Sequence, residues 1–179
     1  MRVPRLSPAQ YRRVTVVVAV LLGAIIVTGG AVRLTGSGLG CPDWPNCEPG
    51  RLTPYTANDF HAMVEFVNRT VTGLVSVAVI VAVLGSLVRA PRRTDLLVLS
   101  LGLVAGVVVQ IVLGALVVQK LLSPPWVMSH FLVSMLLLAN ALVLCRRAGQ
   151  PDAGFARRPV PIVAPSVLWM SRVLVVAAS

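Results

Sequence analysis

One short segment of the chain carries several polar side chains that can do chemistry. At about 100° per residue, four of them fall within roughly 60° of one another on a helix: His61, Glu65, Asn68 and Thr72. Arg69 lies beside them, and apolar residues separate them before a hydrophobic run begins. A membrane helix is expected to carry such groups on one side only where that side faces protein, water or a ligand. This polar stripe therefore predicts a functional site.

A simpler interpretation treats the same residues as interfacial. Glu65 and Arg69 are spaced i,i+4 in the favourable order, so they can form an ion pair that eases entry of the helix into the membrane. That interpretation explains any one of these polar residues, whereas several on one side of a helix favour a site.

Composition indicates the class of protein. Hydrophobic residues make up 56% of the 179 residues and charged residues 12%, against about 25% charged residues in soluble domains. The chain is therefore predicted to be an integral membrane protein. The net charge of +10 could suggest a nucleic-acid binder. However, the arginines lie between apolar runs rather than in a patch with interleaved aromatic residues, which argues against nucleic-acid binding.

Four apolar runs predict an all-α, four-helix transmembrane bundle, with spans at residues 14–32, 59–88, 96–118 and 127–144. The first run covers about 28 Å of hydrocarbon. It is longer than a signal-peptide core and lacks a small-residue cleavage site, so we expect it to be retained. Asp59 is the expected N-cap of the second span.

The same pattern divides the chain into segments. A basic N-terminus (1–13) precedes the bundle (14–145), which includes a glycine- and proline-rich loop at 33–58. A polar linker (146–166) leads to residues 167–179, which are apolar but too few to cross a bilayer. This last segment is expected either to lie on the membrane surface or to begin a fifth span that continues in a longer protein.

The basic residues predict the orientation. Eleven lie at the N-terminus and in the loops after the second and fourth spans, against four on the other side: Arg33, Arg51, Arg69 and Lys120. By the positive-inside rule, the N-terminus is cytoplasmic. The 33–58 loop, the polar stripe and His130 are then all predicted at the outer face.

Two cysteines flank a proline-containing turn in the outward loop. Cys41 and Cys47 would face an oxidising compartment, where a disulfide persists and could contribute on the order of 2 kcal/mol. Whether the pair is structural or passes electrons stays open. A zinc site is less favoured because no second pair of soft ligands lies nearby. Cys145 is expected to be a free thiol.

His130, about one turn into the fourth span, is the second candidate. A lone histidine is commonly a hydrogen-bonded packing residue. Here its depth matches that of Glu65 and Asn68, and a neutral imidazole facing the interior suits axial ligation of haem iron. His61 lies nearer the loop and is more simply explained as an interfacial residue.

Several motifs occur in order along residues 14–145: GGAVRLTGSGLGC (29–41), WPNC (44–47), VEFVNR (64–69), GALV (114–117) and SHFL (129–132). Together they resemble the N-terminal half of haem A synthase. Members of that family consist of two similar four-helix halves. The resemblance implies that this chain supplies the first half and the beginning of the fifth span.

The resemblance implies oxidation of the C8 methyl group of haem O to a formyl group, giving haem A for terminal oxidases. It implies that Glu65 is the carboxylate implicated in catalysis, that His130 is a haem ligand, and that Cys41 and Cys47 form the outward disulfide. The N-terminal half would hold the substrate haem, and the C-terminal half a haem b. The implied setting is a bacterial plasma membrane, with haem O synthase and terminal oxidase assembly as partners and a homo-oligomer as a further option.

Asn68 departs from the family pattern Glu-x-x-His-Arg. Because an amide is a poor iron ligand, either His130 alone binds the iron or His61 substitutes. Glu65 could act as a base or stabilise developing charge. Arg33 and Arg69 could hold haem propionates.

Two other functions stay open from the sequence. A four-span thiol oxidoreductase working with quinone would also combine an outward cysteine pair with a short bundle, although such proteins usually carry two pairs or a C-x-x-C motif. A non-catalytic haem-binding or assembly subunit would suit half of a longer protein. Bound haem in the purified protein would separate these functions.

Overall fold

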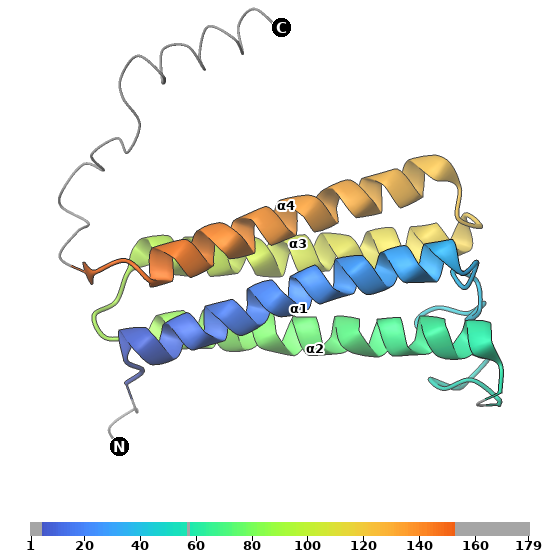
Figure 1. The fold of residues 1–179 in the computed structure, drawn as a ribbon, viewed down its shortest axis with the longest axis horizontal. Coiled ribbons are helices and arrows are strands. Elements are labelled where there is room, and N and C mark those ends of the chain that lie inside the picture. Colours follow the sequence, from blue (N-terminus) through green and yellow to red (C-terminus); the bar gives the residue numbers. More distant parts are fainter. Residues whose placement is uncertain (1–4, 57, 153–179) are drawn as a thin grey trace, which may run out of the picture. The chain divides into compact units, whose positions relative to one another are not determined.

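A computed structural model describes residues 5–56 and 58–152. It contains four helices: α1 (Pro8–Leu34), α2 (Phe60–Val88), α3 (Thr94–Gln119) and α4 (Pro124–Ala148) (Figure 1). Each is long and apolar enough to cross a membrane. The chain is therefore a multi-pass membrane protein, and the predicted all-α membrane bundle is confirmed. The predicted fifth span at 167–179 and most of the 146–166 linker lie outside the described residues.

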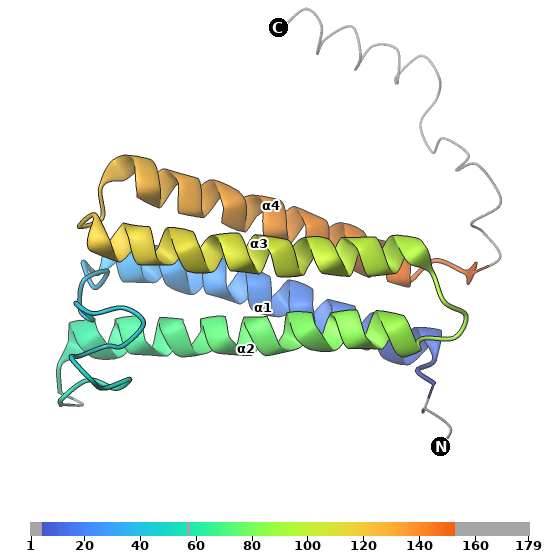
Figure 2. The ribbon, with the colours of Figure 1, turned by 180° about the vertical axis from the view of Figure 1, so that it is seen from behind.

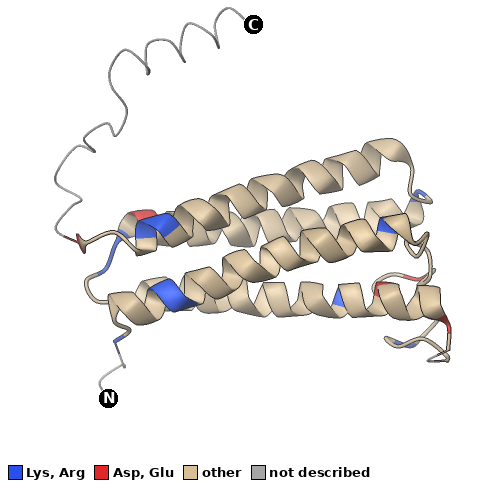
Figure 3. Ribbon diagram, in the orientation of Figure 1, with Lys and Arg blue, Asp and Glu red and all other residues tan. Residues whose placement is uncertain are grey.

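The helices pack in a ring in which each contacts two neighbours. α1 packs on α2 and α4, and α3 packs on the same two helices, whereas no Cα atoms of the diagonal pairs come within 8 Å. Figures 1 and 2 show the α2–α3 connection at one end of the bundle, and the α1–α2 loop and the α3–α4 connection at the other. We call these the N-terminal end and the loop end. Charged residues gather near both ends (Figure 3).

Local polar signals set where the first two helices begin. The Ser7 hydroxyl accepts from the Gln10 amide at 3.2 Å, and the Gln10 side chain accepts from the Ser7 amide at 2.9 Å. This capping box, with Pro8 in the first turn, starts α1 earlier than the predicted residue 14. The apolar run alone did not predict this earlier start, because the capping residues are polar. Asp59 caps α2 as predicted, accepting from the Ala62 amide at 3.0 Å.

The apolar core fills the half of the bundle nearer the N-terminal end. All four helices contribute to it: Tyr11, Val18, Leu22, Val75, Val79, Ala82, Leu96, Leu103, Leu137, Ala141, Leu144 and Ala148. In the half nearer the loop end, the only buried helical residues are Ala62 and Glu65, which lie beneath the loop. Apart from the small cluster that the two loop cysteines form with Ala62 and Phe66, the main apolar core does not extend into the loop-side half.

Candidate functional site

The predicted disulfide is present in the α1–α2 loop. The sulfur atoms of Cys41 and Cys47 are bonded, and the two residues are 0% and 1% exposed. Ala62 and Phe66 of α2 pack against them. Cys145 is a free thiol, also as predicted. The redox role of the Cys41–Cys47 pair stays a prediction.

The loop lies directly against the first turns of α2 because residue 40 is glycine. A Cβ atom at Gly40 would lie 2.3 Å from the carbonyl oxygen of His61 and 2.6 Å from the amide nitrogen of Ala62. Both are backbone atoms of a helix, so neither can turn aside as a side chain could. Only glycine allows this close approach, which places the Cys41 amide over α2.

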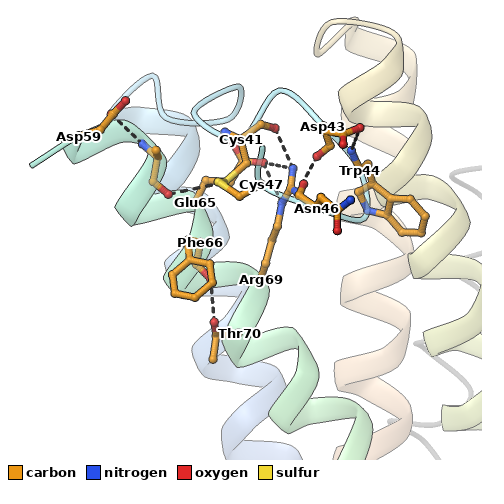
Figure 4. Close-up of a disulfide and its surroundings, with 11 residues drawn as sticks. Cys41, Asp43, Trp44, Asn46, Cys47, Asp59, Glu65, Phe66, Arg69 and Thr70 are labelled. Carbon is orange, nitrogen blue, oxygen red and sulfur yellow. Dashed lines mark hydrogen bonds and ion pairs between the residues drawn. A yellow bond between two sulfur atoms is a disulfide. The ribbon is translucent and has the colours of Figure 1, made fainter. Parts of the chain in front are cut away.

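Arg69 fastens the loop to α2 with all five of its N–H groups (Figure 4). Two of them donate to Glu65 Oε1, from Nε at 3.1 Å and from Nη2 at 2.6 Å. The other three donate to carbonyl oxygens of the loop, at 3.0 Å in Cys41, 2.8 Å in Asp43 and 2.6 Å in Asn46. In this arrangement Arg69 has no donor left for a haem propionate.

Glu65 is held in the same network. The residue is 6% exposed, and the ion pair with Arg69 that the i,i+4 spacing predicted is present at 2.6 Å. Its second oxygen, Oε2, accepts from the Cys41 amide at 2.9 Å. Both carboxylate oxygens therefore bind charged or polar donors that belong to the loop attachment. The geometry indicates a positioning role, and direct participation of Glu65 in catalysis stays a prediction.

The other residues of the polar stripe have separate partners. Asn68 Nδ2 donates to the Thr28 hydroxyl of α1 at 2.9 Å, and the Thr72 hydroxyl donates to the Asn68 carbonyl at 3.2 Å. His61 Nδ1 lies 2.9 Å from the Ser37 hydroxyl at the start of the loop. The stripe thus joins α2 to α1 and to the loop, because those are the elements packed against that side of α2.

His130 lies in the second turn of α4, against α3. A Cβ atom at Gly114 would lie 3.8 Å from the His130 Cε1 atom, so the imidazole covers this glycine. Neither ring nitrogen hydrogen-bonds a described residue, and Nδ1 is buried. A buried polar atom without a partner is uncommon in proteins. An imidazole with an uncommitted nitrogen is the kind of ligand that haem iron takes, so His130 fits that role.

Arg33 differs from Arg69 in its surroundings. It lies in the last turn of α1 and is exposed. Its side chain makes no hydrogen bond or ion pair with the part of the chain that the structure describes. The guanidinium is therefore available to an anionic ligand at the loop end.

Sequence reasoning singled out His130 but missed its neighbours on α3 and α4. Gln110 Nε2 donates to the His130 carbonyl at 3.1 Å and to the Ser134 hydroxyl. The sequence signal for this cluster was Gln110 itself. An amide side chain inside an otherwise apolar membrane span rarely lacks a partner or a function.

Comparison with known proteins identifies the family to which this chain is similar. The sequence profile of the family described as "Cytochrome oxidase assembly protein", COX15-CtaA, matches residues 12–179. A heme A synthase of Exiguobacterium sibiricum is 33% identical over 131 residues, which cover 70% of this chain and 43% of that protein. One of Listeria welshimeri is 28% identical over 151 residues, covering 83% and 49%. The chain thus spans less than half the length of the curated relatives it matches. The resemblance inferred from the motifs is confirmed, and the chain belongs to the COX15-CtaA family of cytochrome oxidase assembly proteins.

Proposed function

We propose that this chain is the substrate-haem half of a haem A synthase, the enzyme that oxidises the C8 methyl group of haem O to a formyl group. The observation that carries the proposal is the position of His130. Its half-buried imidazole, which bonds none of the described residues, lies in the half of the bundle nearer the loop end, outside the main apolar core. Haem O is the substrate in this proposal, and haem A is the product used by terminal oxidases.

Binding of haem O needs a nitrogen ligand for the iron, apolar walls for the porphyrin and cations for the propionates. We assign the nitrogen ligand to His130. The half-buried apolar residues of α3 and α4 near the loop end supply the apolar walls. We assign the propionates to Arg33, because the Arg69 donors all serve the loop.

We assign Glu65 to the attachment of the loop beside the substrate. A role as a base, or as a group that stabilises charge at the methyl carbon, would require one carboxylate oxygen to exchange its present donor for the substrate. Asn68 and His61 then act as anchors to α1 and to the loop rather than as iron ligands.

The setting of this activity is also part of the proposal. The excess of arginine at the N-terminal end favours a cytoplasmic N-terminus, with the disulfide loop outside the plasma membrane of a bacterium. A haem b and the remaining catalytic parts would belong to the half of the enzyme beyond this chain. Haem O synthase and a terminal oxidase under assembly are the proposed partners.

The test is expression of the chain in bacterial cells that make haem O but no haem A. The purified chain is expected to carry haem, and His130→Ala is expected to lose it or to change its visible spectrum. His61→Ala, the matched control on the other histidine, should retain both haem and spectrum. Haem A in the extract would show that this half is active alone, whereas haem O alone would indicate a haem-binding subunit. A colourless wild-type protein would contradict the proposal.

The alternative of a thiol oxidoreductase is less favoured. Both cysteines are almost fully buried between the loop and α2, whereas a disulfide that exchanges electrons with partners needs access for an attacking thiol.

A further inference from the structure

We infer that Gln110 is a positioning residue for His130: the Gln110 amide oxygen accepts a hydrogen bond directly from His130 Nδ1–H, a bond that the two side chains do not make in this structure. This bond sets the tautomer that leaves His130 Nε2 with a free lone pair for haem iron. The inference rests on the proposed function, since it assigns a partner to the proposed iron ligand.

Gln110 is already tied to the backbone that carries the ring. Its Nε2 atom donates to the His130 carbonyl at 3.1 Å and to the Ser134 hydroxyl. That hydroxyl in turn donates to the His130 carbonyl at 2.9 Å. Because a carbonyl oxygen can only accept, the amide cannot be reversed without losing the bond to His130. The orientation of the Gln110 side chain is therefore fixed by its contacts.

Two buried polar atoms in this cluster have no partner among the described residues: Gln110 Oε1 and His130 Nδ1. They are complementary, since an amide oxygen accepts and a ring nitrogen of neutral histidine can donate. Buried polar atoms are rarely left unpaired, because desolvation is then uncompensated. A bond between these two satisfies both atoms at once.

The identity of the protonated nitrogen matters for the iron. A neutral imidazole has a hydrogen on one nitrogen and a lone pair on the other. Nε2 bonds no described residue and is not one of the buried unpartnered atoms, so it is partly exposed and is the nitrogen that a ligand can reach. Metal-binding histidines usually donate their other N–H to an acceptor that holds the ring and its tautomer. We assign that acceptor role to Gln110, whose amide nitrogen already bonds the His130 carbonyl and whose oxygen has no described partner.

The first experiment is NMR of isotope-labelled histidine nitrogens in the purified full chain without haem. A His61→Gln background leaves His130 as the one imidazole. We expect the Nδ1–H tautomer in this parent and in Gln110→Glu, which keeps an acceptor. Gln110→Leu should shift the population toward Nε2–H. An Nε2–H tautomer in the parent, or the same tautomer in the parent and in Gln110→Leu, would overturn the inference.

The second experiment measures the Kd for ferric haem b. Gln110→Leu is expected to bind about 10–100-fold more weakly, the usual effect of losing such an acceptor. The matched control is Asn140→Leu, since the Asn140 amide also joins α4 to α3, through the Leu99 carbonyl at 3.1 Å, and its affinity should be unchanged. Equal weakening by both variants would show a general loss of packing and would overturn the inference.

The two experiments separate this inference from the proposed function. If the parent protein binds no haem, the proposed function fails, while the tautomer measurement still decides whether Gln110 and His130 are bonded. If Gln110→Leu does not fold, the tautomer of the parent alone decides it.

Discussion

Replacement of Arg69 by methionine should loosen the disulfide loop while leaving the disulfide itself intact. The substitution keeps an unbranched side chain of similar reach but removes five hydrogen bonds. Three of these hold the loop carbonyls of Cys41, Asp43 and Asn46, and two hold Glu65. The loop would then depend on the Cys41 amide bond to Glu65, on the contact between Ser37 and His61, and on packing against α2.

The expected magnitude follows from the exposure of the ion pair. Hydrogen bonds to charged groups contribute about 1.5–3 kcal/mol each, but bonds made by one side chain are not additive. Removal of one partner of a buried ion pair costs about 3–5 kcal/mol. The Arg69 and Glu65 side chains are 21% and 8% exposed, so solvent screens part of their interaction. We therefore expect about 3 kcal/mol, or a roughly 100-fold larger population of the open loop.

The rate at which a small thiol reduces the disulfide measures this population, because Cys41 and Cys47 are buried when the loop is closed. In a Cys145→Ser background, thiols released by dithiothreitol are counted by maleimide labelling. Arg69→Met should be reduced roughly 100-fold faster than its parent. Arg51→Met is the matched control in the same loop, where Arg51 contacts the Tyr55 ring at 5.2 Å and should matter little. A rate for Arg69→Met within about twofold of its parent would refute the proposed fastening of the loop.

Three further substitutions test neighbouring parts of the site. Gly40→Ala places a Cβ atom against the α2 backbone, so the disulfide should be reduced at least about tenfold faster, whereas Gly30→Ala, with no atom near, should match the parent. Asn68→Ala removes one bond between helices and should lower Tm by roughly 1–3 °C. It should leave the haem spectrum unchanged, and an altered spectrum would show that Asn68 touches the haem. Glu65→Gln places an amide NH2 group where Arg69 and the Cys41 amide now donate, so reduction of the disulfide should accelerate and the proposed haem A formation should stop. Unchanged reduction with lost activity would instead favour direct chemistry by Glu65.

The fold could be predicted largely from the sequence because the signals for it are local or compositional. Four apolar runs of sufficient length give the four helices, and Asp59 sits where an N-cap is needed. The disulfide also followed from two cysteines separated by a short, proline-containing turn. The start of α1 was missed because the capping box at Ser7 and Gln10 lies outside the apolar run.

The site could be predicted only in part. Helical spacing predicted the Glu65–Arg69 pair, which is present. It could not show that the three remaining Arg69 donors bind backbone carbonyls, since acceptors of that kind depend on the path of the loop and not on residue type. A polar side of α2 likewise does not reveal which neighbour it faces. Here that side faces α1 and the loop, whereas α4 and His130 lie diagonally across the bundle.

The most direct test of the central claim is pulsed electron paramagnetic resonance of the chain reconstituted with ferric haem and isotope-labelled histidine. Binding through His130 predicts hyperfine coupling of the iron to a histidine nitrogen, present in the parent and in His61→Ala and absent in His130→Ala. Coupling that persists in His130→Ala, or a parent protein without any such coupling, would contradict the assignment of His130 as the iron ligand.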